Sequence, residues 1–315
     1  GPPDSIKGIV DMTNLTRTQS QTGAAARPIW VERWLQRQAM TLHFLKRNPL
    51  AVVGLVILGT ILLGALLAPV IAPHDPTKVS VKEMLDPPSA AHPFGTDFLG
   101  RDLFSRILHG GRNTLAIGLA VVTLAFVVGV SVGIFSGFTG GWVDVVIMRI
   151  VDAMLSFPAL VLAIAFAAAL GPSLTNSMLA VALTLIPQFA RLARGQALGV
   201  RSLLHVEAAR SLGAGTGRLL WKHILPLCLG PLLVQASLSL GSAILQTASL
   251  GFLGLGAQPP TPEWGADVSA GAQFIRESPW VALFPGLTIL LSVLAFNLIG
   301  DALVDWMNPR TRKGY

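Results

Sequence analysis

The chain has 315 residues, of which 52% are hydrophobic and only 12% are charged. Soluble domains carry about 25% charged residues, so this composition excludes an ordinary soluble protein. The net charge of +7 would suggest nucleic acid in a soluble protein, but here the basic residues flank apolar segments, so membrane topology explains them and we expect no nucleic-acid partner. Apolar runs of about 20 residues predict spanning helices rather than a barrel, whose strands alternate over about 10 residues. The expected class is an all-α polytopic membrane protein.

Two segments precede the first apolar run. Residues 1–27 are polar and rich in Ser, Thr and Gln, which predicts a disordered cytoplasmic tail. Residues 28–49 carry Trp30 and Trp34 one helical turn apart, together with several basic residues. This pattern predicts an amphipathic helix in the membrane interface, with a solvated basic arm as the alternative.

Six apolar spans are predicted from the rest of the chain. They cover about 50–73, 113–138, 145–170, 174–190, 224–250 and 280–305. Asn113 and Thr114 are the expected cap of the second span, and Pro158 inside the third could kink it. In the preceding loop, Asp97 with Arg101 and Asp102 with Arg106 have helical i,i+4 spacing.

These spans divide the chain into units. We expect residues 50–112 to form the first transmembrane helix and an extracytoplasmic loop. Residues 113–306 should form a core of five helices that includes a loop at 191–223, and residues 307–315 a cytoplasmic tail. Six spans place both termini on one side. Most of the 23 Lys and Arg residues lie in the termini and the 191–223 loop, which predicts that these segments are cytoplasmic.

The loop at 191–223 contains an unusual motif. From Glu207 the sequence reads EAARSLGAGTG, which predicts a short helix ended by Gly213, because glycine readily takes the left-handed conformation. Small Ala208 and Ala209 permit the close approach of another surface. We interpret this helix as a contact with a soluble partner; a plain linker is the alternative. The candidate contact residues are Glu207, Ala208, Ala209, Arg210, Ser211, Leu212, Gly213 and Ala214.

Enzyme chemistry has no visible support in the sequence. There is no phosphate-binding glycine loop and no Gly-x-Ser-x-Gly motif, and the six histidines are scattered without metal-ligand spacing. We therefore expect no catalytic residue, no metal site and no cofactor in this chain. An ion-coupled carrier would show charges deep in its spans. Arg149 and Asp152, at i,i+3 near one end of the third span, are better read as a structural ion pair.

Several long strings resemble the membrane subunits of bacterial ABC importers. The loop motif resembles their EAA loop, with Glu207, Ala208, Ala209, Gly213 and Pro226 in the family's places; His223 stands where the family has isoleucine, and Ile224 is shifted by one. The strings at 95–106, 148–158, 247–265 and 284–305 are similar to those of the dipeptide/oligopeptide permease C branch, which includes nickel-permease relatives. The resemblance covers residues 45–310.

The resemblance implies a type I importer permease with a cytoplasmic EAA coupling helix, in a bacterial inner membrane. It also implies partners: a homologous B-type permease subunit, two cytoplasmic ATPase domains that bind ATP and Mg²⁺, and an extracytoplasmic solute-binding protein. Di- or oligopeptides are the expected cargo, with nickel chelates, glutathione or haem as alternatives. The outer loop 251–279 is either a surface for the binding protein or a structural plug. Its candidate contact residues are Pro259, Pro260, Pro262, Glu263 and Trp264.

Overall fold

The computed structural model describes residues 48–307. The predicted tail at 1–27, almost all of the predicted interfacial helix at 28–49, and residues 308–315 lie outside the described residues. Between residues 48 and 307 the protein is helical, and the β-structure there is limited to an isolated antiparallel bridge between Thr96 and Asp102.

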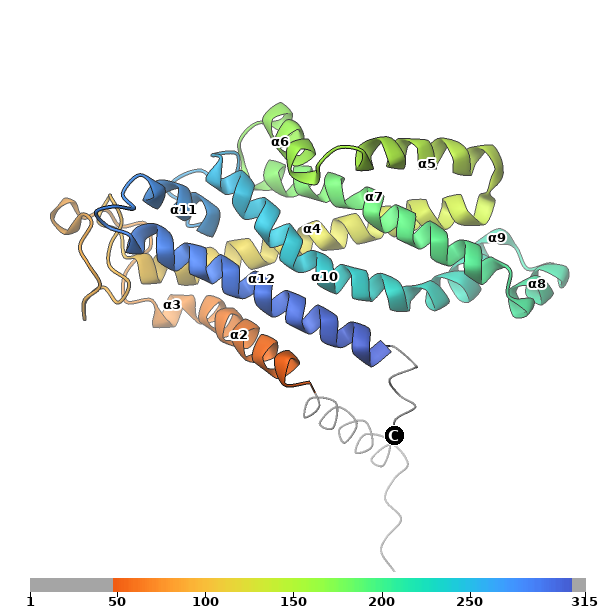
Figure 1. Ribbon diagram of the computed structural model, residues 1–315, viewed down its shortest axis with the longest axis horizontal. Helices are drawn as coiled ribbons and strands as arrows, with labels where there is room; N and C mark the ends of the chain where they lie inside the picture. Colours follow the sequence, from red (N-terminus) through yellow and green to blue (C-terminus); the bar gives the residue numbers. More distant parts are fainter. Residues whose placement is uncertain (1–47, 308–315) are drawn as a thin grey trace, which may run out of the picture. The chain divides into compact units, whose positions relative to one another are not determined.

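The helices follow one another along the chain as drawn in Figure 1. Their bounds are α2 Pro49–Leu66, α3 Ala68–Ile71, η2 Val81–Glu83, α4 Leu103–Thr139, α5 Gly141–Leu155, α6 Ala159–Leu170, α7 Leu174–Arg201, α8 Leu204–Ser211, α9 Thr216–Arg218, the π-helical turn η3 Leu219–Ile224, α10 Leu225–Phe252, α11 Trp264–Ala272 and α12 Trp280–Met307.

Four helical runs within the described residues are long and apolar enough to cross a membrane. These are α2, α4, the continuous run from α9 to the end of α10, and α12. α5 and α6 qualify together as one span that is bent by 95°. The break contains Pro158, as the sequence predicted, because proline lacks the N–H that would continue the helix.

The helix α7 has the length of a span but a more polar sequence. Asn176, Gln188 and Arg191 dilute its apolar residues. It packs against α4, α5, α6 and α10, so much of its surface contacts protein. A helix that is covered in this way needs fewer apolar residues than one that faces lipid. The fourth predicted span, at 174–190, therefore stays a prediction.

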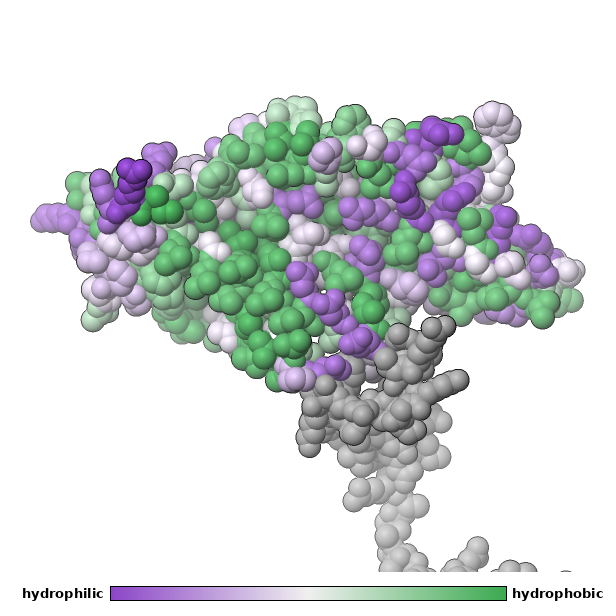
Figure 2. Space-filling model, viewed as in Figure 1, coloured by the Kyte–Doolittle hydropathy of each residue, from purple (hydrophilic) through white to green (hydrophobic). Residues whose placement is uncertain are grey.

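The lipid-facing surface is clearest on α2 and α12. Figure 2 shows a broad hydrophobic area over these two helices. The fold leaves large apolar side chains of α2 and α12 exposed, including Leu55, Val56, Leu63, Leu66, Leu283, Leu287 and Leu290. An exposed apolar area of this kind marks a surface that contacts lipid or another protein.

Two predicted helix boundaries are wrong. The second span begins at Leu103 rather than Asn113, because the Asp102 carboxylate accepts a hydrogen bond from the Ser105 N–H and caps the helix there. Asn113 lies inside α4 and donates to the Pro262 carbonyl. The fourth span continues past residue 190 to Arg201, so the loop predicted at 191–223 starts only at Ser202.

Three glycines of α4 let it approach α7 closely. Gly129, Gly133 and Gly137 are spaced four residues apart and are all buried. A Cβ on Gly133 would lie 2.1 Å from the Ala190 carbonyl oxygen, and one on Gly129 would lie 2.7 Å from that of Ile186. Small residues at this spacing allow two helix backbones to touch, as is common between membrane helices. The α4–α7 pair therefore forms the centre of the bundle.

The bundle has two chemically different ends. Figure 1 shows α8 and α9 at one end, and α11 with the 72–102 segment at the other. α4 has 37 residues and a rise of about 1.5 Å per residue makes it about 55 Å long, so it connects the two ends. The candidate residues from the sequence lie at these ends.

Candidate functional site

The motif at Glu207–Ala214 forms a compact helical knob. α8 runs from Leu204 to Ser211, and Gly213 follows with φ +82°. The Ala214 N–H donates to the Ala209 carbonyl at 3.1 Å and the Gly213 N–H to the Arg210 carbonyl at 2.9 Å. This pair of bonds around a left-handed glycine is the Schellman motif. The structure thus ends the helix at the glycine that the sequence indicated.

Most of the knob is exposed. Glu207, Ala208 and the residues from Arg210 to Gly213 all reach solvent, whereas Ala209 and Ala214 are half-buried against the core. Two leucines at the ends of the helix stand out, because Leu204 is 84% and Leu212 89% exposed. Large exposed apolar side chains on a protruding loop mark an interaction surface. The predicted contact residues included Leu212 but not Leu204. Its place three residues before Glu207 was the signal in the sequence that could have identified it.

The knob is attached firmly to the bundle. Val206 is 1% exposed and packs in the core. The Arg210 guanidinium lies 5.4 Å from the centre of the Phe138 ring at the end of α4, which is cation–π distance. A force on α8 would therefore reach α4.

The return to the membrane keeps an apolar anchor. η3 is a π-helical turn from Leu219 to Ile224, and a π turn holds more residues than an α turn. Ile224 is fully buried, whereas His223 is half-exposed. The one-residue shift of isoleucine in the motif thus leaves an isoleucine in the core.

Charged residues near this end join α5 to α7, although not as the sequence suggested. Asp152 pairs with Arg191 of α7, and the described residues contain no ion pair between Arg149 and Asp152. A second link joins Asp144 to Arg194 through two hydrogen bonds of 2.6 Å. The two acids of α5 thus bind arginines across the α5–α7 helix pair.

The residues Pro259–Trp264 at the other end divide into two groups. Pro259 and Pro260 are exposed, but Pro262 is buried and Glu263 and Trp264 are each only 1% exposed. A buried side chain cannot touch a separate protein, so the interpretation of these three as contact residues is wrong for this conformation. They fit the alternative, a segment that packs between helices.

Trp264 is held by close packing and one hydrogen bond. Its indole Nε1–H donates to the Ile107 carbonyl at 2.9 Å. The ring lies against Gly110 and Gly111, where an added Cβ would come within 3.1 and 3.0 Å of it. Glu263 caps α11 by accepting from the N–H groups of Gly265 and Ala266. Burial raises the pKa of Glu263 to about 7.

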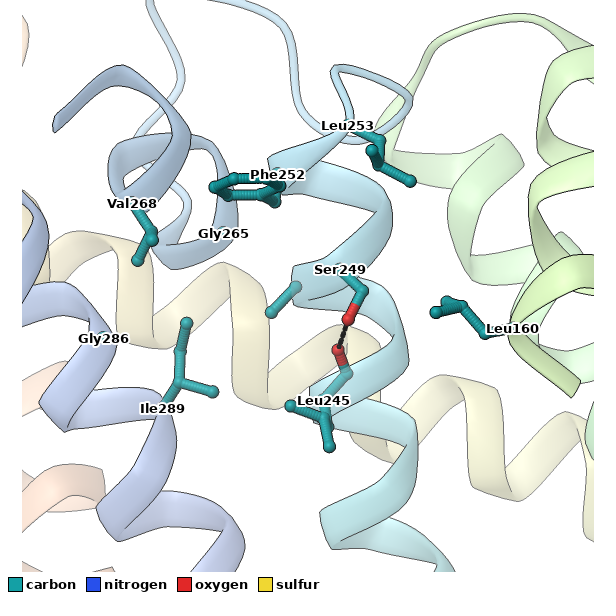
Figure 3. Close-up of a pocket in the computed structure, with 10 residues that line it drawn as sticks. Leu160, Leu245, Ser249, Phe252, Leu253, Gly265, Val268, Gly286 and Ile289 are labelled. Atoms are coloured by element: carbon teal, nitrogen blue, oxygen red, sulfur yellow. Dashed lines mark hydrogen bonds between the residues drawn. The ribbon is translucent and has the colours of Figure 1, made fainter. Parts of the chain in front are cut away.

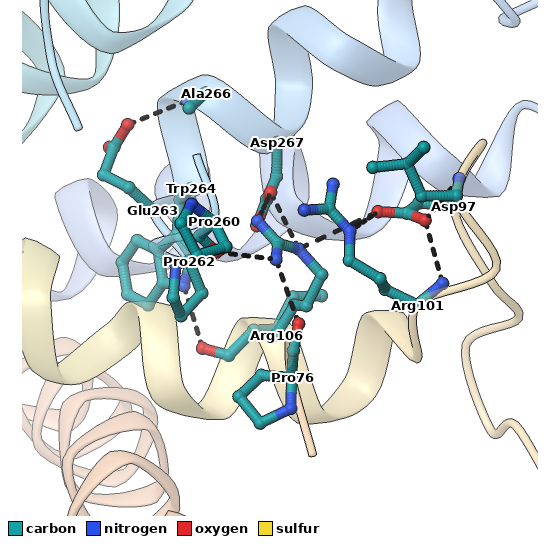
Figure 4. A network of polar contacts seen from close by, with 12 residues as sticks. Pro76, Asp97, Arg101, Arg106, Pro260, Pro262, Glu263, Trp264, Ala266 and Asp267 are labelled. Carbon is teal, nitrogen blue, oxygen red and sulfur yellow. Dashed lines mark hydrogen bonds and ion pairs between the residues drawn. The ribbon is translucent and has the colours of Figure 1, made fainter. Parts of the chain in front are cut away.

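A buried polar network ties the outer segments together (Figure 4). Arg106 of α4 donates to the Asp267 carboxylate of α11 through Nη2 at 2.5 Å and Nε at 3.0 Å. Its Nη1 donates to the carbonyls of Pro76 and Pro260. Asp97 accepts from the Arg101 Nε at 2.6 Å, but in a turn rather than a helix. The i,i+4 pairing predicted for Asp102 and Arg106 does not form, because Asp102 caps α4.

An apolar cavity of about 370 Å³ lies between α6, α10, α11 and α12 (Figure 3). Its lining includes Leu160, Leu245, Phe252 and Ile289. The hydroxyl of Ser249 donates to the Leu245 carbonyl at 2.7 Å. The cavity thus offers apolar surface and no charged group.

Two family models match the chain. One is described as "Binding-protein-dependent transport system inner membrane component" and covers residues 129–313. The other is described as "N-terminal TM domain of oligopeptide transport permease C" and covers residues 39–88.

Curated relatives are similar over most of their length. The probable D,D-dipeptide transport system permease protein DdpC of Escherichia coli (strain K12) is 49% identical over 291 residues, which is 92% of this chain and 97% of the relative. The dipeptide transport system permease protein DppC of Alkalihalophilus pseudofirmus is 46% identical, over 85% of this chain and 88% of the relative. The glutathione transport system permease protein GsiD of Pectobacterium atrosepticum is 42% identical, over 91% of this chain and 93% of the relative.

The fold is similar to that of a solved transporter. An inward-facing structure of the MetNI methionine ABC transporter contains a chain with a TM-score of 0.52 and 22% identity. The match covers 64% of the present chain and 95% of the other. At this level of identity the match concerns the fold alone.

Proposed function

The chain belongs to the family of binding-protein-dependent transport system inner membrane components, and we propose that it forms half of the pore through which an ATP-driven importer moves di- or oligopeptides. The family membership makes it a multi-pass permease subunit of the inner membrane. The peptide cargo rests on the relatives, because those named for dipeptides reach 49% and 46% identity. The relative named for glutathione, itself a peptide, reaches 42%.

The partners in this proposal follow from the division of labour in such transporters. A homologous B-type permease completes the pore, a solute-binding protein delivers the peptide outside, and two cytoplasmic ATPase domains bind ATP and Mg²⁺. The present chain carries out no hydrolysis and holds no nucleotide. Both termini and α8 lie in the cytoplasm in this arrangement, in agreement with the distribution of Lys and Arg.

The observation that carries the coupling role is the exposed knob at α8. Its apolar ends, Leu204 and Leu212, are solvent-exposed. Covering such side chains with a partner's groove removes apolar surface from water, which favours binding. Val206 and Arg210 fix the knob to the bundle. Closure of the ATPase domains would move α8, and α8 would move α4 and α7 toward the outward-open state. A plain linker would not need this attachment.

Reconstitution tests the proposal. The chain is purified with its B-type partner and ATPases, placed in proteoliposomes and supplied with the binding protein and a radiolabelled dipeptide. Uptake should require both ATP and the binding protein, and an excess of unlabelled dipeptide should suppress it. A free amino acid at the same concentration is the matched control. Uptake driven by an ion gradient without ATP would refute the importer assignment, and uptake of only non-peptide cargo would refute the peptide assignment.

A further inference from the structure

Three potential metal ligands from separate segments meet at the end of the bundle that carries α11. His74 follows α3, His92 lies in the loop before α4, and Asp102 is the cap of α4. One ligand atom from each lies within 4.8 Å of the others. The sequence showed only scattered histidines, because these two are 18 positions apart and are brought together by the fold.

The two imidazoles point at the same carboxylate oxygen. The Nδ1 atom of His92 lies 2.9 Å from Asp102 Oδ1, and the Nδ1 atom of His74 lies 3.9 Å from that oxygen. The two rings are stacked, with their centres 4.7 Å apart. If Asp102 served only to hold His92, the Nδ1 atom of His74 would not need to point at Oδ1 as well.

These separations suit a shared cation after a small adjustment. Transition metals bind His nitrogen and carboxylate oxygen at about 2.0–2.2 Å, so two ligand atoms of one ion are at most about 4.4 Å apart. The two distances to Oδ1 satisfy this limit, whereas the spread of up to 4.8 Å among the three ligand atoms exceeds it, so the two histidine nitrogens must move closer together. The side chain of His74 is 39% exposed, which leaves its ring room to turn and close any remaining gap.

The surroundings position the ligands in the way that metal sites require. Asp102 Oδ2 accepts from the Ser105 N–H at 2.8 Å, so Oδ1 is the oxygen directed at the histidines. On the far side of the His92 ring, Nε2 lies 4.0 Å from the Glu83 carboxylate. This distance is too long for a hydrogen bond, but the negative charge of Glu83 favours a proton on Nε2 and so leaves Nδ1 available for metal.

We propose that His74, His92 and Asp102 bind one divalent transition-metal ion, with Zn²⁺ as the best fit. Two neutral imidazoles and one carboxylate supply nitrogen and oxygen ligands, which favour Zn²⁺, Co²⁺, Ni²⁺ or Cu²⁺ over the oxygen-seeking Mg²⁺ and Ca²⁺. Water from the exposed side of His74 would complete the coordination. The ion takes a place between His92 Nδ1 and Asp102 Oδ1, so the neutral His92 ring that binds it through Nδ1 carries its proton on Nε2; a ring that starts with a proton on both nitrogens releases the Nδ1 proton to solvent. The bound ion would join the segment after α3 and the 84–100 loop to the start of α4.

Zinc binding by the purified full chain, in detergent and without a polyhistidine tag, tests this site. Isothermal titration with Zn²⁺ should show one site per chain, and affinity should fall at least tenfold in His74→Asn and in His92→Asn. His109→Asn is the matched control, because His109 is near in sequence, hydrogen-bonds to the Ser105 carbonyl and lies outside the cluster. Zn²⁺ should also raise the thermal midpoint of the wild type but not that of His74→Asn.

The outcomes separate clearly. Wild type that binds no Zn²⁺, or His74→Asn that binds as tightly as wild type, overturns the proposal. So does an equal loss of affinity in His109→Asn. His92 is largely buried, so its variant could fail to fold; in that case His74→Asn decides the question, since its half-exposed ring can change without disturbing the core.

Discussion

Replacing Arg106 by Gln should lower the free energy of unfolding by about 3–5 kcal/mol, because it leaves a buried carboxylate without its counter-ion. Arg106 and Asp267 are 3% and 5% exposed in their side chains, and Nη2 approaches Oδ1 to 2.5 Å. The variant also loses the hydrogen bond to the Pro76 carbonyl, which adds about 1 kcal/mol.

Asp267→Asn provides the comparison. This variant should lower the free energy of unfolding by less, because Arg106 retains other partners. Its Nε still lies 4.0 Å from the Asp97 carboxylate, and its Nη1 still donates to the carbonyls of Pro76 and Pro260. The double variant Arg106→Gln/Asp267→Asn should be more stable than the sum of the two losses predicts, since two neutral amides can hydrogen-bond to each other. Stability is measured by denaturant titration in detergent, followed by tryptophan fluorescence. A loss below about 1 kcal/mol in Arg106→Gln, which is the range of an exposed pair, would refute the reasoning.

Three further predictions concern single residues and the isolated chain. Burial raises the pKa of Glu263 from 4.5 to about 7, so the folded protein keeps a proton that the unfolded chain releases between these values, and the free energy of unfolding should fall as pH rises from 4.5 to 7 and level off above 7. Glu263→Gln should remove this decline. If the difference in free energy of unfolding between wild type and variant stays constant with pH, the prediction is contradicted. Gly133→Ala should destabilise the α4–α7 contact by several kcal/mol, since its Cβ would lie 2.1 Å from the Ala190 carbonyl oxygen, whereas Gly199→Ala, with nothing within 4 Å, should be neutral or stabilising in the same denaturation assay. The purified chain alone should neither bind nor hydrolyse ATP, and phosphate release above that of an empty-detergent control would contradict this.

Apolar sequence located the helices well but their ends poorly. The cores of α2, α10 and α12 were predicted to within a few residues because runs of apolar side chains directly reflect contact with lipid. The starts and ends are marked by polar contacts instead. α4 begins ten residues early because Asp102 caps it. α7 continues to Arg201, and along this extension Arg191 and Arg194 pair with Asp152 and Asp144 of α5 while Arg201 donates to the Gly137 carbonyl.

The two ends of the bundle differ in how far local sequence describes them. The knob at α8 is made from neighbouring residues, so the left-handed Gly213 and the exposed helix before it could be predicted. The α11 end is made from contacts between distant segments. Arg106 and Asp267 are 161 positions apart, and Trp264 reaches the Ile107 carbonyl across 157. No spacing rule reveals such pairs, which is why the sequence left open whether Glu263 and Trp264 contact a binding protein or pack between helices.

The central claim, that α8 transmits ATPase closure to the pore, is tested most directly by peptide uptake in proteoliposomes with variants of the knob. Gly213→Val forces a branched side chain into φ +82°, and Glu207→Lys reverses the charge at an exposed position near the start of α8. Each should abolish ATP-dependent dipeptide uptake while the complex still co-purifies intact. Gly217→Val, at a glycine of the same loop without a positive φ, should retain uptake. Normal uptake by the double variant Glu207→Lys/Gly213→Val would contradict the claim.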